Sequence, residues 1–130
     1  MAVPNLTTIL KRILKQPTAP FHEYHVRAEI ESLLKDCPNV KLKRDKFGNL
    51  LATYKNGKSK SKPTWVLGAH MDHPAFVRAP GSKTEWQFLG GVPQPEVDAG
   101  VKKGLRSKPK GDIATWNFPV NVTAEKIEAT

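Results

Sequence analysis

The stretch from Trp65 to Ala69 constrains the fold of this chain more than any other part, because it is apolar throughout. A short continuous apolar run is typical of a β-strand that is covered on both faces. Such a strand needs a packed layer above it and another below it. The run therefore predicts an α/β protein in which helices cover a central sheet.

Two helices are predicted ahead of this strand. Asn5 is a suitable N-cap for the first, and the two prolines of the QPTAP segment at 16–20 end it. The second is predicted from His22 to Lys35. The apolar stripes at helical spacing that predict these helices are Leu6, Ile9, Leu10, Ile13 and Leu14 in the first, and Val26, Ile30, Leu33 and Leu34 in the second.

A β-hairpin is predicted between the second helix and the apolar run. Val40 and Leu42 alternate with lysines, which is the pattern of a half-buried strand. The segment DKFGN at 45–49 has a glycine and an asparagine that tolerate the left-handed backbone of a turn. Residues 50–54 then form the return strand. This hairpin adds two strands to the predicted mixed sheet.

The second half of the chain has a different pattern. Short β candidates at 86–89, 97–105 and 113–118 are separated by glycines and prolines, and no helix is predicted apart from a short turn near Ala124. We therefore predict three parts. Residues 1–80 carry the two helices and part of the mixed sheet, 81–122 form a β-rich, barrel-like section, and 123–130 form a strand that returns toward the first sheet.

Composition narrows the possible settings. The sequence has no apolar run of about 18 residues, the length that a membrane-spanning helix needs, so no membrane partner is expected. Residues 1–5 lack the charged and then apolar pattern of a signal peptide. Cys37 is the only cysteine, so it has no internal disulfide partner. These features predict a cytoplasmic, reducing location.

The net charge of +9 permits a second class of function. An excess of Lys and Arg suits binding to nucleic acid or to an acidic protein. The basic residues are spread along the chain, however, and aromatic residues do not alternate with them as a base-stacking surface requires. We expect a solvated surface, and a non-enzymatic basic binding module for nucleic acid or an acidic partner is the alternative function.

His70, Asp72 and His73 follow directly after the apolar run. Imidazole and carboxylate groups are standard ligands of zinc, manganese and cobalt. Because alternate residues of a strand point to the same side, His70 and Asp72 can face one site, where Asp72 accepts the second ring N–H of a metal-bound His70. The alternative is a strand end whose polar residues simply meet solvent.

The sequence does not show a complete hydrolytic site. A metal centre needs three or four protein ligands, and hydrolysis also needs a base. The sequence has no Glu-Glu pair, no Asp-Asp pair and no His-Glu-x-x-His motif. His22 and His25 are three residues apart, and we expect them to be ordinary surface or half-buried histidines.

Four segments together resemble a known family: QPTAPFHEYHVRAEIESLL, RDKFGNLLATY, WVLGAHMDHPAF and FLGG. In this order they are similar to the N-terminal part of the dinuclear-metal aminopeptidases of the glutamyl-aminopeptidase and deblocking-aminopeptidase group, in the zinc exopeptidase clan. The loop of prolines and threonine, the Asp45–Asn49 turn and the His70-Met71-Asp72 motif carry the likeness. It is strongest from residue 16 to residue 91.

The resemblance implies a hydrolase that removes N-terminal residues from peptides with two divalent metal ions, either zinc or cobalt. It implies that His70 is a metal ligand and that Asp72 is the catalytic-site carboxylate that supports it, and His73 is a candidate for substrate binding. Residues from about 85 to 120 would belong to the inserted β-barrel-like domain of that family, and homo-oligomers are possible.

Family members have a bridging Asp, a Glu-Glu pair with the general base, a further carboxylate and a final His. The resemblance places all of these beyond Thr130. We therefore expect an N-terminal fragment or truncated relative of a metallo-aminopeptidase, incomplete relative to the family and inactive by itself.

Overall fold

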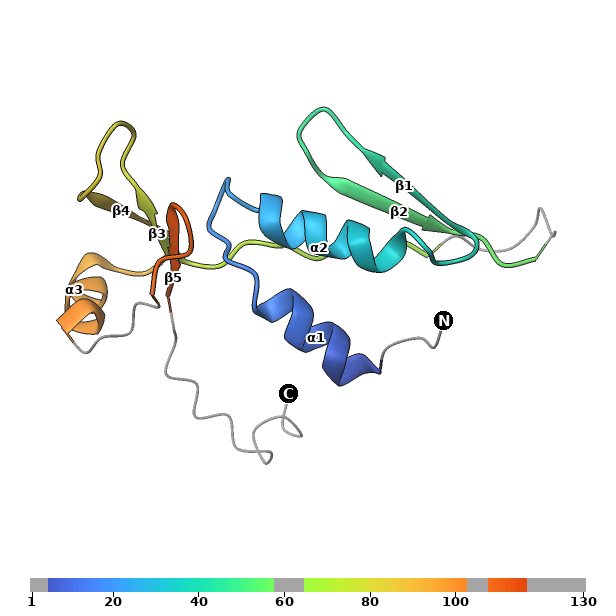
Figure 1. The fold of residues 1–130 in the computed structure, drawn as a ribbon, viewed down its shortest axis with the longest axis horizontal. Coiled ribbons are helices and arrows are strands. Elements are labelled where there is room, and N and C mark those ends of the chain that lie inside the picture. Colours follow the sequence, from blue (N-terminus) through green and yellow to red (C-terminus); the bar gives the residue numbers. More distant parts are fainter. Residues whose placement is uncertain (1–4, 58–64, 103–107, 117–130) are drawn as a thin grey trace.

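The computed structural model describes residues 5–57, 65–102 and 108–116, which form a small α/β protein. The elongated molecule has helices α1 and α2 and the hairpin β1–β2 toward one end, and strands β3 to β5 with helix α3 toward the other (Figure 1). The elements are α1 (Leu6–Leu14), α2 (Tyr24–Leu34), β1 (Val40–Arg44), β2 (Leu50–Tyr54), β3 (Ala75–Arg78), β4 (Trp86–Leu89), α3 (Gln94–Lys102) and β5 (Ile113–Thr115).

Helix α1 begins at the predicted cap. The Asn5 side chain accepts a hydrogen bond from the backbone N–H of Thr8 at 2.8 Å, which satisfies one of the free donors of the first turn. An ion pair of 2.5 Å between Arg12 and Glu29 links α1 to α2. No residue of α1 is buried, although its apolar stripe predicts a covered face. Among the described elements, α2 is the main neighbour of α1, so much of the stripe meets solvent.

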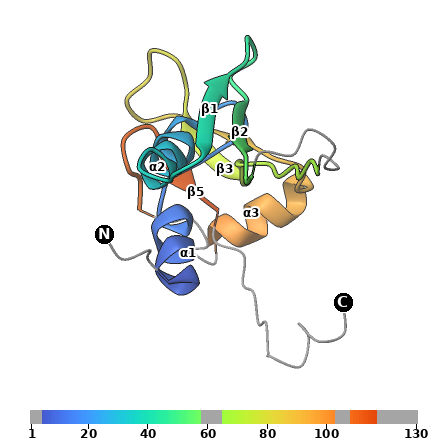
Figure 2. The same ribbon diagram turned by 90° about the vertical axis from the view of Figure 1, so that its right-hand side faces the viewer.

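Helix α2 lies between α1 and the hairpin β1–β2 in both views (Figures 1 and 2). It is shorter than predicted, and of its four predicted core positions Val26 is buried while Ile30, Leu33 and Leu34 are half-buried. The hairpin is joined to α2 by two hydrogen bonds from Arg44 to the Glu31 carboxylate, at 2.6 and 2.5 Å.

The hairpin itself is confirmed, and its strands pair antiparallel with Leu42 opposite Ala52. Its turn is held by the Asp45 carboxylate, which accepts hydrogen bonds from the backbone N–H groups of Phe47 and Asn49 and from the Asn49 side chain. Gly48 has φ +89°, where a side chain would be strained. Local turn chemistry was enough to predict this element.

The second sheet has the strand order β4-β3-β5, with both pairs antiparallel. Alternation along β3 sends Ala75 and Val77 to one face, where they pack with Ala19 from the loop after α1. Phe76 faces the other side and packs with Val97 of α3 and with Trp116. The ring centroids of Phe76, Phe88 and Trp116 lie 5.1 to 5.8 Å apart, an aromatic cluster that closes this face.

The buried strand predicted at Trp65–Ala69 is not present. These residues have no regular secondary structure, and Trp65 and Leu67 are 86% and 95% exposed. An apolar run indicates that its side chains favour burial, but a β-strand also needs neighbouring strands that complete its backbone hydrogen bonds. The described residues supply no such neighbour, and the chain becomes a strand only later, at β3.

The β candidate at 97–105 is also wrong over its described part, because residues 94–102 form helix α3. Val97 and Val101 are four residues apart, a spacing that suits a helix and not the predicted strand. Pro95 lies in the first turn, where its missing N–H costs nothing. Strand β3 has no counterpart among the predicted strands.

The α/β class is confirmed, and the described strands form two small antiparallel sheets. The β candidate at 86–89 is confirmed as β4, and that at 113–118 is confirmed for residues 113–115. Residues 103–105, 117–118, the turn near Ala124 and the strand at 123–130 lie outside the described residues. The division into 1–80, 81–122 and 123–130 stays a prediction.

Candidate functional site

The predicted site lies on residues 70–74, an extended segment without regular secondary structure that leads into β3. Two hydrogen bonds from distant parts of the chain hold its backbone. The Thr18 hydroxyl donates to the carbonyl of Met71 at 2.9 Å, and the backbone N–H of Trp116 donates to the carbonyl of Pro74 at 3.1 Å. The backbone is therefore fixed within the His70–His73 cluster, at Met71, and directly after it, at Pro74.

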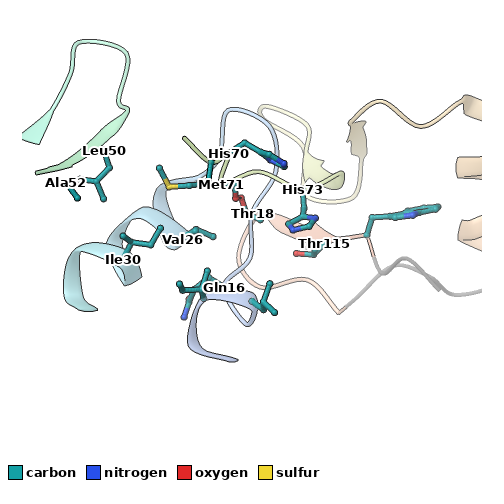
Figure 3. A pocket seen from close by; sticks show the side chains of 14 residues that line it. Gln16, Thr18, Val26, Ile30, Leu50, Ala52, His70, Met71, His73 and Thr115 are labelled. Atoms are coloured by element: carbon teal, nitrogen blue, oxygen red, sulfur yellow. The ribbon is translucent and has the colours of Figure 1, made fainter. Parts of the chain in front are cut away.

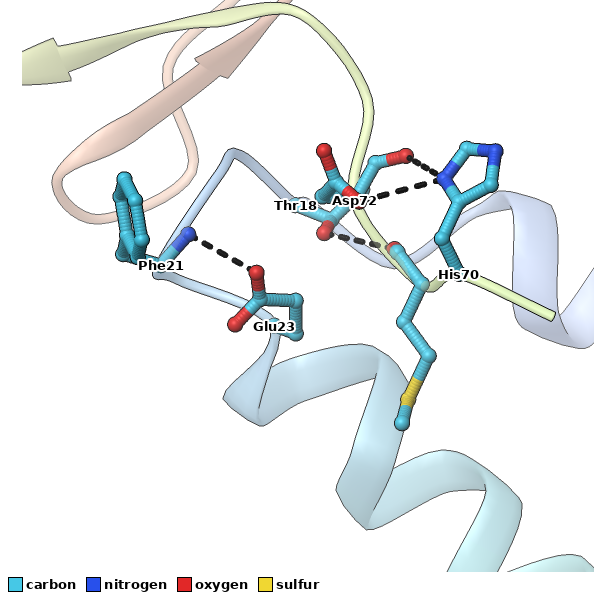
Figure 4. Close-up of polar contacts among 6 residues, drawn as sticks. Thr18, Phe21, Glu23, His70 and Asp72 are labelled. Atoms are coloured by element: carbon cyan, nitrogen blue, oxygen red, sulfur yellow. Dashed lines mark hydrogen bonds and ion pairs between the residues drawn. The ribbon is translucent and has the colours of Figure 1, made fainter. Parts of the chain in front are cut away.

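His70 and Asp72 are in contact, as the His-x-Asp motif predicts. The Nδ1 atom of His70 lies 3.0 Å from the backbone carbonyl of Asp72 and 3.1 Å from its Oδ1 atom (Figure 4). A carbonyl and a carboxylate can only accept, so Nδ1 carries the proton. In a neutral ring this leaves the lone pair on Nε2, which faces away from Asp72 in Figure 4.

The exposed position of this pair leaves Nε2 accessible. The His70 side chain is 80% exposed, and that of Asp72 is about one-third exposed. An imidazole with Nδ1 held by a carboxylate and Nε2 open is the arrangement in which protein histidines bind metal ions. His70 therefore presents an open ring nitrogen although it does not stand at the end of a strand.

A cleft of about 650 Å³ lies beside His70 and His73 (Figure 3). The two rings are 6.4 Å apart between centroids and are tilted by 57°. The helices contribute apolar side chains to the lining, and β2 contributes two more. The apolar residues of the lining include Ile13, Val26, Ile30, Leu50, Ala52 and Met71. The cleft is thus lined by apolar side chains and by the two imidazole rings.

The remaining predicted histidines are elsewhere. His22 and His25 are not among the residues that line the cleft, and the Nδ1 atom of His22 lies 3.0 Å from the carbonyl of Pro20. His22 contacts the ring of Tyr24, as does His25. Both are half-buried, one of the two positions predicted for them.

The cluster at 70–73 supplies few ligands. Within residues 5–57, 65–102 and 108–116, no group of three or more His, Cys, Asp or Glu side chains is placed to hold a metal ion. His70 offers one nitrogen, and the Asp72 carboxylate is engaged with the same ring. This part of the chain can contribute one oriented ligand to a divalent ion.

Sequence reasoning missed two residues that shape the site. Thr18 lies 53 residues before the carbonyl it bonds, and Trp116 lies 42 positions after Pro74. Neither contact has a local sequence signal, because each depends on how the loop after α1 and the end of β5 pack around residues 70–74. The two prolines around Thr18 predicted a loop, but they did not predict that the Thr18 hydroxyl bonds to Met71.

Comparison of this chain with known protein families, with characterised proteins and with solved structures finds no match. A search of the described helices for one with the length and apolar character to cross a lipid bilayer also finds none. The geometry of the His70–Asp72 pair and its cleft is therefore the basis for a proposed function.

Proposed function

We propose that this chain carries the first metal ligand of a dinuclear-metal aminopeptidase site, with His70 as the ligand and Asp72 as its supporting carboxylate. The observation that supports the proposal is the hydrogen bonding of the His70 ring. Asp72 fixes the proton on Nδ1 and leaves Nε2 free and exposed. A histidine at the surface without such a partner has no reason to prefer this tautomer.

In this proposal each residue has a separate task. His70 binds a zinc or cobalt ion through Nε2, and Asp72 orients the ring and increases its basicity. His73 and the apolar wall contact the N-terminal part of a peptide, with the wall formed by side chains such as Ile13, Val26 and Leu50. The bound metal would polarise the peptide carbonyl and activate a water molecule.

Hydrolysis requires more than these residues. A catalytic metal site needs at least three protein ligands and a base, and the described residues gather one ligand with one supporting carboxylate. We therefore propose that the chain binds a divalent ion weakly by itself and is inactive alone. The further ligands, and the mixed sheet of the peptidase fold, would have to come from additional residues. The single cysteine fits a reducing, cytoplasmic setting.

A basic binding module is less well supported. Arg12, Arg44 and Arg78 each already form an ion pair with a carboxylate, so their guanidinium groups are partly neutralised. The net charge of +9 still favours some attraction to polyanions. If such attraction were the function, binding to DNA or RNA would be strong and would fall steeply as salt is added.

Calorimetric titration with zinc or cobalt in a non-chelating buffer tests the proposal. We expect saturable binding of one ion to the wild-type chain and none to His70→Gln. Asp72→Asn keeps the shape of the side chain but removes its charge, so it should weaken binding by about tenfold or more. These losses follow if the metal enters at Nε2 and the carboxylate supports the ring.

The matched control is His22→Gln. The ring of His22 also has its Nδ1 atom near a backbone carbonyl, but it has neither a carboxylate nor the cleft beside it. This variant should bind the metal as the wild type does. Equal losses in His22→Gln and His70→Gln, or no change in either, would show that His70 is not the ligand.

A further inference from the structure

Thr18 is the one polar residue among the buried residues of the described chain, with 3% of its surface exposed. It lies in the loop between α1 and α2, beside Ala19, which is fully buried against Ala75 and Val77 of β3 and Ile113 of β5. Burial of a hydroxyl is costly unless it is hydrogen-bonded. The burial of Thr18 therefore requires a hydrogen-bond partner for its hydroxyl group.

That partner is the backbone carbonyl of Met71, at 2.9 Å from the Thr18 Oγ1 atom (Figure 4). Met71 lies between His70 and Asp72, so this bond fixes the peptide group that joins the two halves of the His70–Asp72 pair. The segment has no strand ladder to hold it in this region. Its next backbone anchor is the bond from Trp116 to Pro74.

We propose that Thr18 is a positioning residue for the metal ligand: its hydroxyl holds the Met71 carbonyl so that Asp72 reaches Nδ1 of His70. The role of Thr18 in metal binding rests on the proposed function above. Its effect on the ring does not, because the tautomer of His70 exists with or without a metal. Thr18 also lines the cleft, and its effect on the His70 ring passes through its hydrogen bond to the Met71 carbonyl.

The hydrogen bond of Thr18 can be tested separately from the packing of its side chain. Ala19 inserts into the core and holds the backbone of the loop beside Thr18. The hydroxyl supplies the bond to Met71. Thr18→Val keeps the shape and removes the donor, whereas Thr18→Ser keeps the donor and removes the methyl group, so the two variants separate hydrogen bonding from packing.

The test is ¹⁵N NMR of the histidine rings in the metal-free chain at about pH 8, above the ordinary range in which histidine is protonated. His70 is assigned by comparison with His70→Gln. We expect the wild type to show the Nδ1–H tautomer at His70 and Thr18→Val to lose it. Thr18→Ser should retain it, and the signals of His22 should stay the same in all three chains.

Metal titration of the same variants gives the second readout. Thr18→Val should weaken zinc binding by about fivefold, the effect of one lost hydrogen bond on a neighbouring group. Thr18→Ser should restore it. If zinc does not bind the wild type at all, the proposed function fails, and the tautomer result alone decides the role of Thr18.

Two results would overturn the inference. One is a folded Thr18→Val chain in which His70 keeps the wild-type tautomer. The other is a folded Thr18→Ser chain in which His70 has lost it, which would assign the effect to packing of the methyl group. If Thr18→Val does not fold, Thr18→Ser decides by itself, because it retains the donor on which the inference depends.

Discussion

At the scale of single residues, the site depends on close contacts that lie outside the motif itself. Gly90 follows β4 and has φ +149°, and a Cβ added to it would lie 2.7 Å from Cβ of Pro74 and 3.0 Å from its Cα. Pro74 directly follows His73. The absence of a side chain at Gly90 therefore lets the end of β4 approach the segment that carries the candidate ligands.

This contact predicts a large effect from one methyl group. Gly90→Ala should lower the free energy of unfolding by about 1–3 kcal/mol, because the new Cβ overlaps Cβ of Pro74, whose ring is tied to the backbone and cannot rotate away. Gly91→Ala is the control, since a Cβ there meets nothing within 4 Å, and it should change stability by less than about 0.5 kcal/mol. Urea denaturation measures both, and equal effects would contradict the close approach.

A second residue-scale prediction concerns pH. The hydrogen bonds from Asn49, and those from the backbone of the turn, lower the pKa of Asp45 below its ordinary value. Because the folded pKa is below the unfolded one, the contribution of Asp45 is complete above the unfolded value and is lost as pH falls through the folded value. The hairpin turn should therefore loosen only in acid, below the ordinary aspartate value of about 3.9.

NMR shifts of the Phe47 and Asn49 amides against pH measure this directly, and Asp45→Asn should abolish the transition. A midpoint at or above the ordinary aspartate value would contradict the hydrogen bonding of the turn. The Glu31 carboxyl behaves in the same sense, since its bonds to Arg44 also lower its pKa.

At the scale of secondary-structure elements, local signals predicted some parts and failed at others for physical reasons. The Asn5 cap and the Asp45–Asn49 turn depend on hydrogen bonds between residues two to four apart, so the local sequence contains all the information they need. Helix α3 has a valine pair whose spacing suits a helix, but the prolines and glycines around it suggested loops and strands. The Trp65–Ala69 prediction failed because strand partners are not a local property.

Helix α3 is held to the second sheet mainly by one face, which gives an element-scale prediction. Val97 is 2% exposed and packs with Phe76, Ala114 and Trp116, whereas Val101, one turn later, is 46% exposed. Val97→Ala should lower the free energy of unfolding by about 2 kcal/mol, through lost burial and a residual cavity. Val101→Ala should cost less than about 0.5 kcal/mol. Similar losses in both would mean that α3 does not pack through Val97.

At the scale of the whole molecule, large apolar side chains are exposed on the described surface, and Phe21, Trp65 and Leu67 are among the most exposed. Exposed apolar groups of this size favour association. We expect sedimentation velocity to show a concentration-dependent increase in mass for the wild type. Leu67→Lys should reduce it, whereas Thr53→Lys adds the same charge at an exposed site on β2 and should not. Concentration-independent sedimentation of the wild type would contradict this expectation.

Only part of the candidate site could be predicted from the sequence. The His-x-Asp motif was enough to predict the contact between His70 and Asp72, because two residues so close in sequence have few ways to meet. It could not predict Thr18, Trp116 or Gly90, which approach residues 70–74 from three distant segments. Nor could it predict that an extended segment, and not a buried strand, presents the histidine.

The central claim is that Asp72 holds the proton of His70 on Nδ1 and leaves Nε2 for a metal ion. The most direct measurement is ¹⁵N NMR of the His70 ring during a zinc titration. The claim predicts that Nε2 shifts with saturation at one ion per chain while Nδ1 keeps its proton. A ring whose two nitrogens do not respond to zinc, or one that loses the Nδ1 proton and binds zinc there, would contradict it.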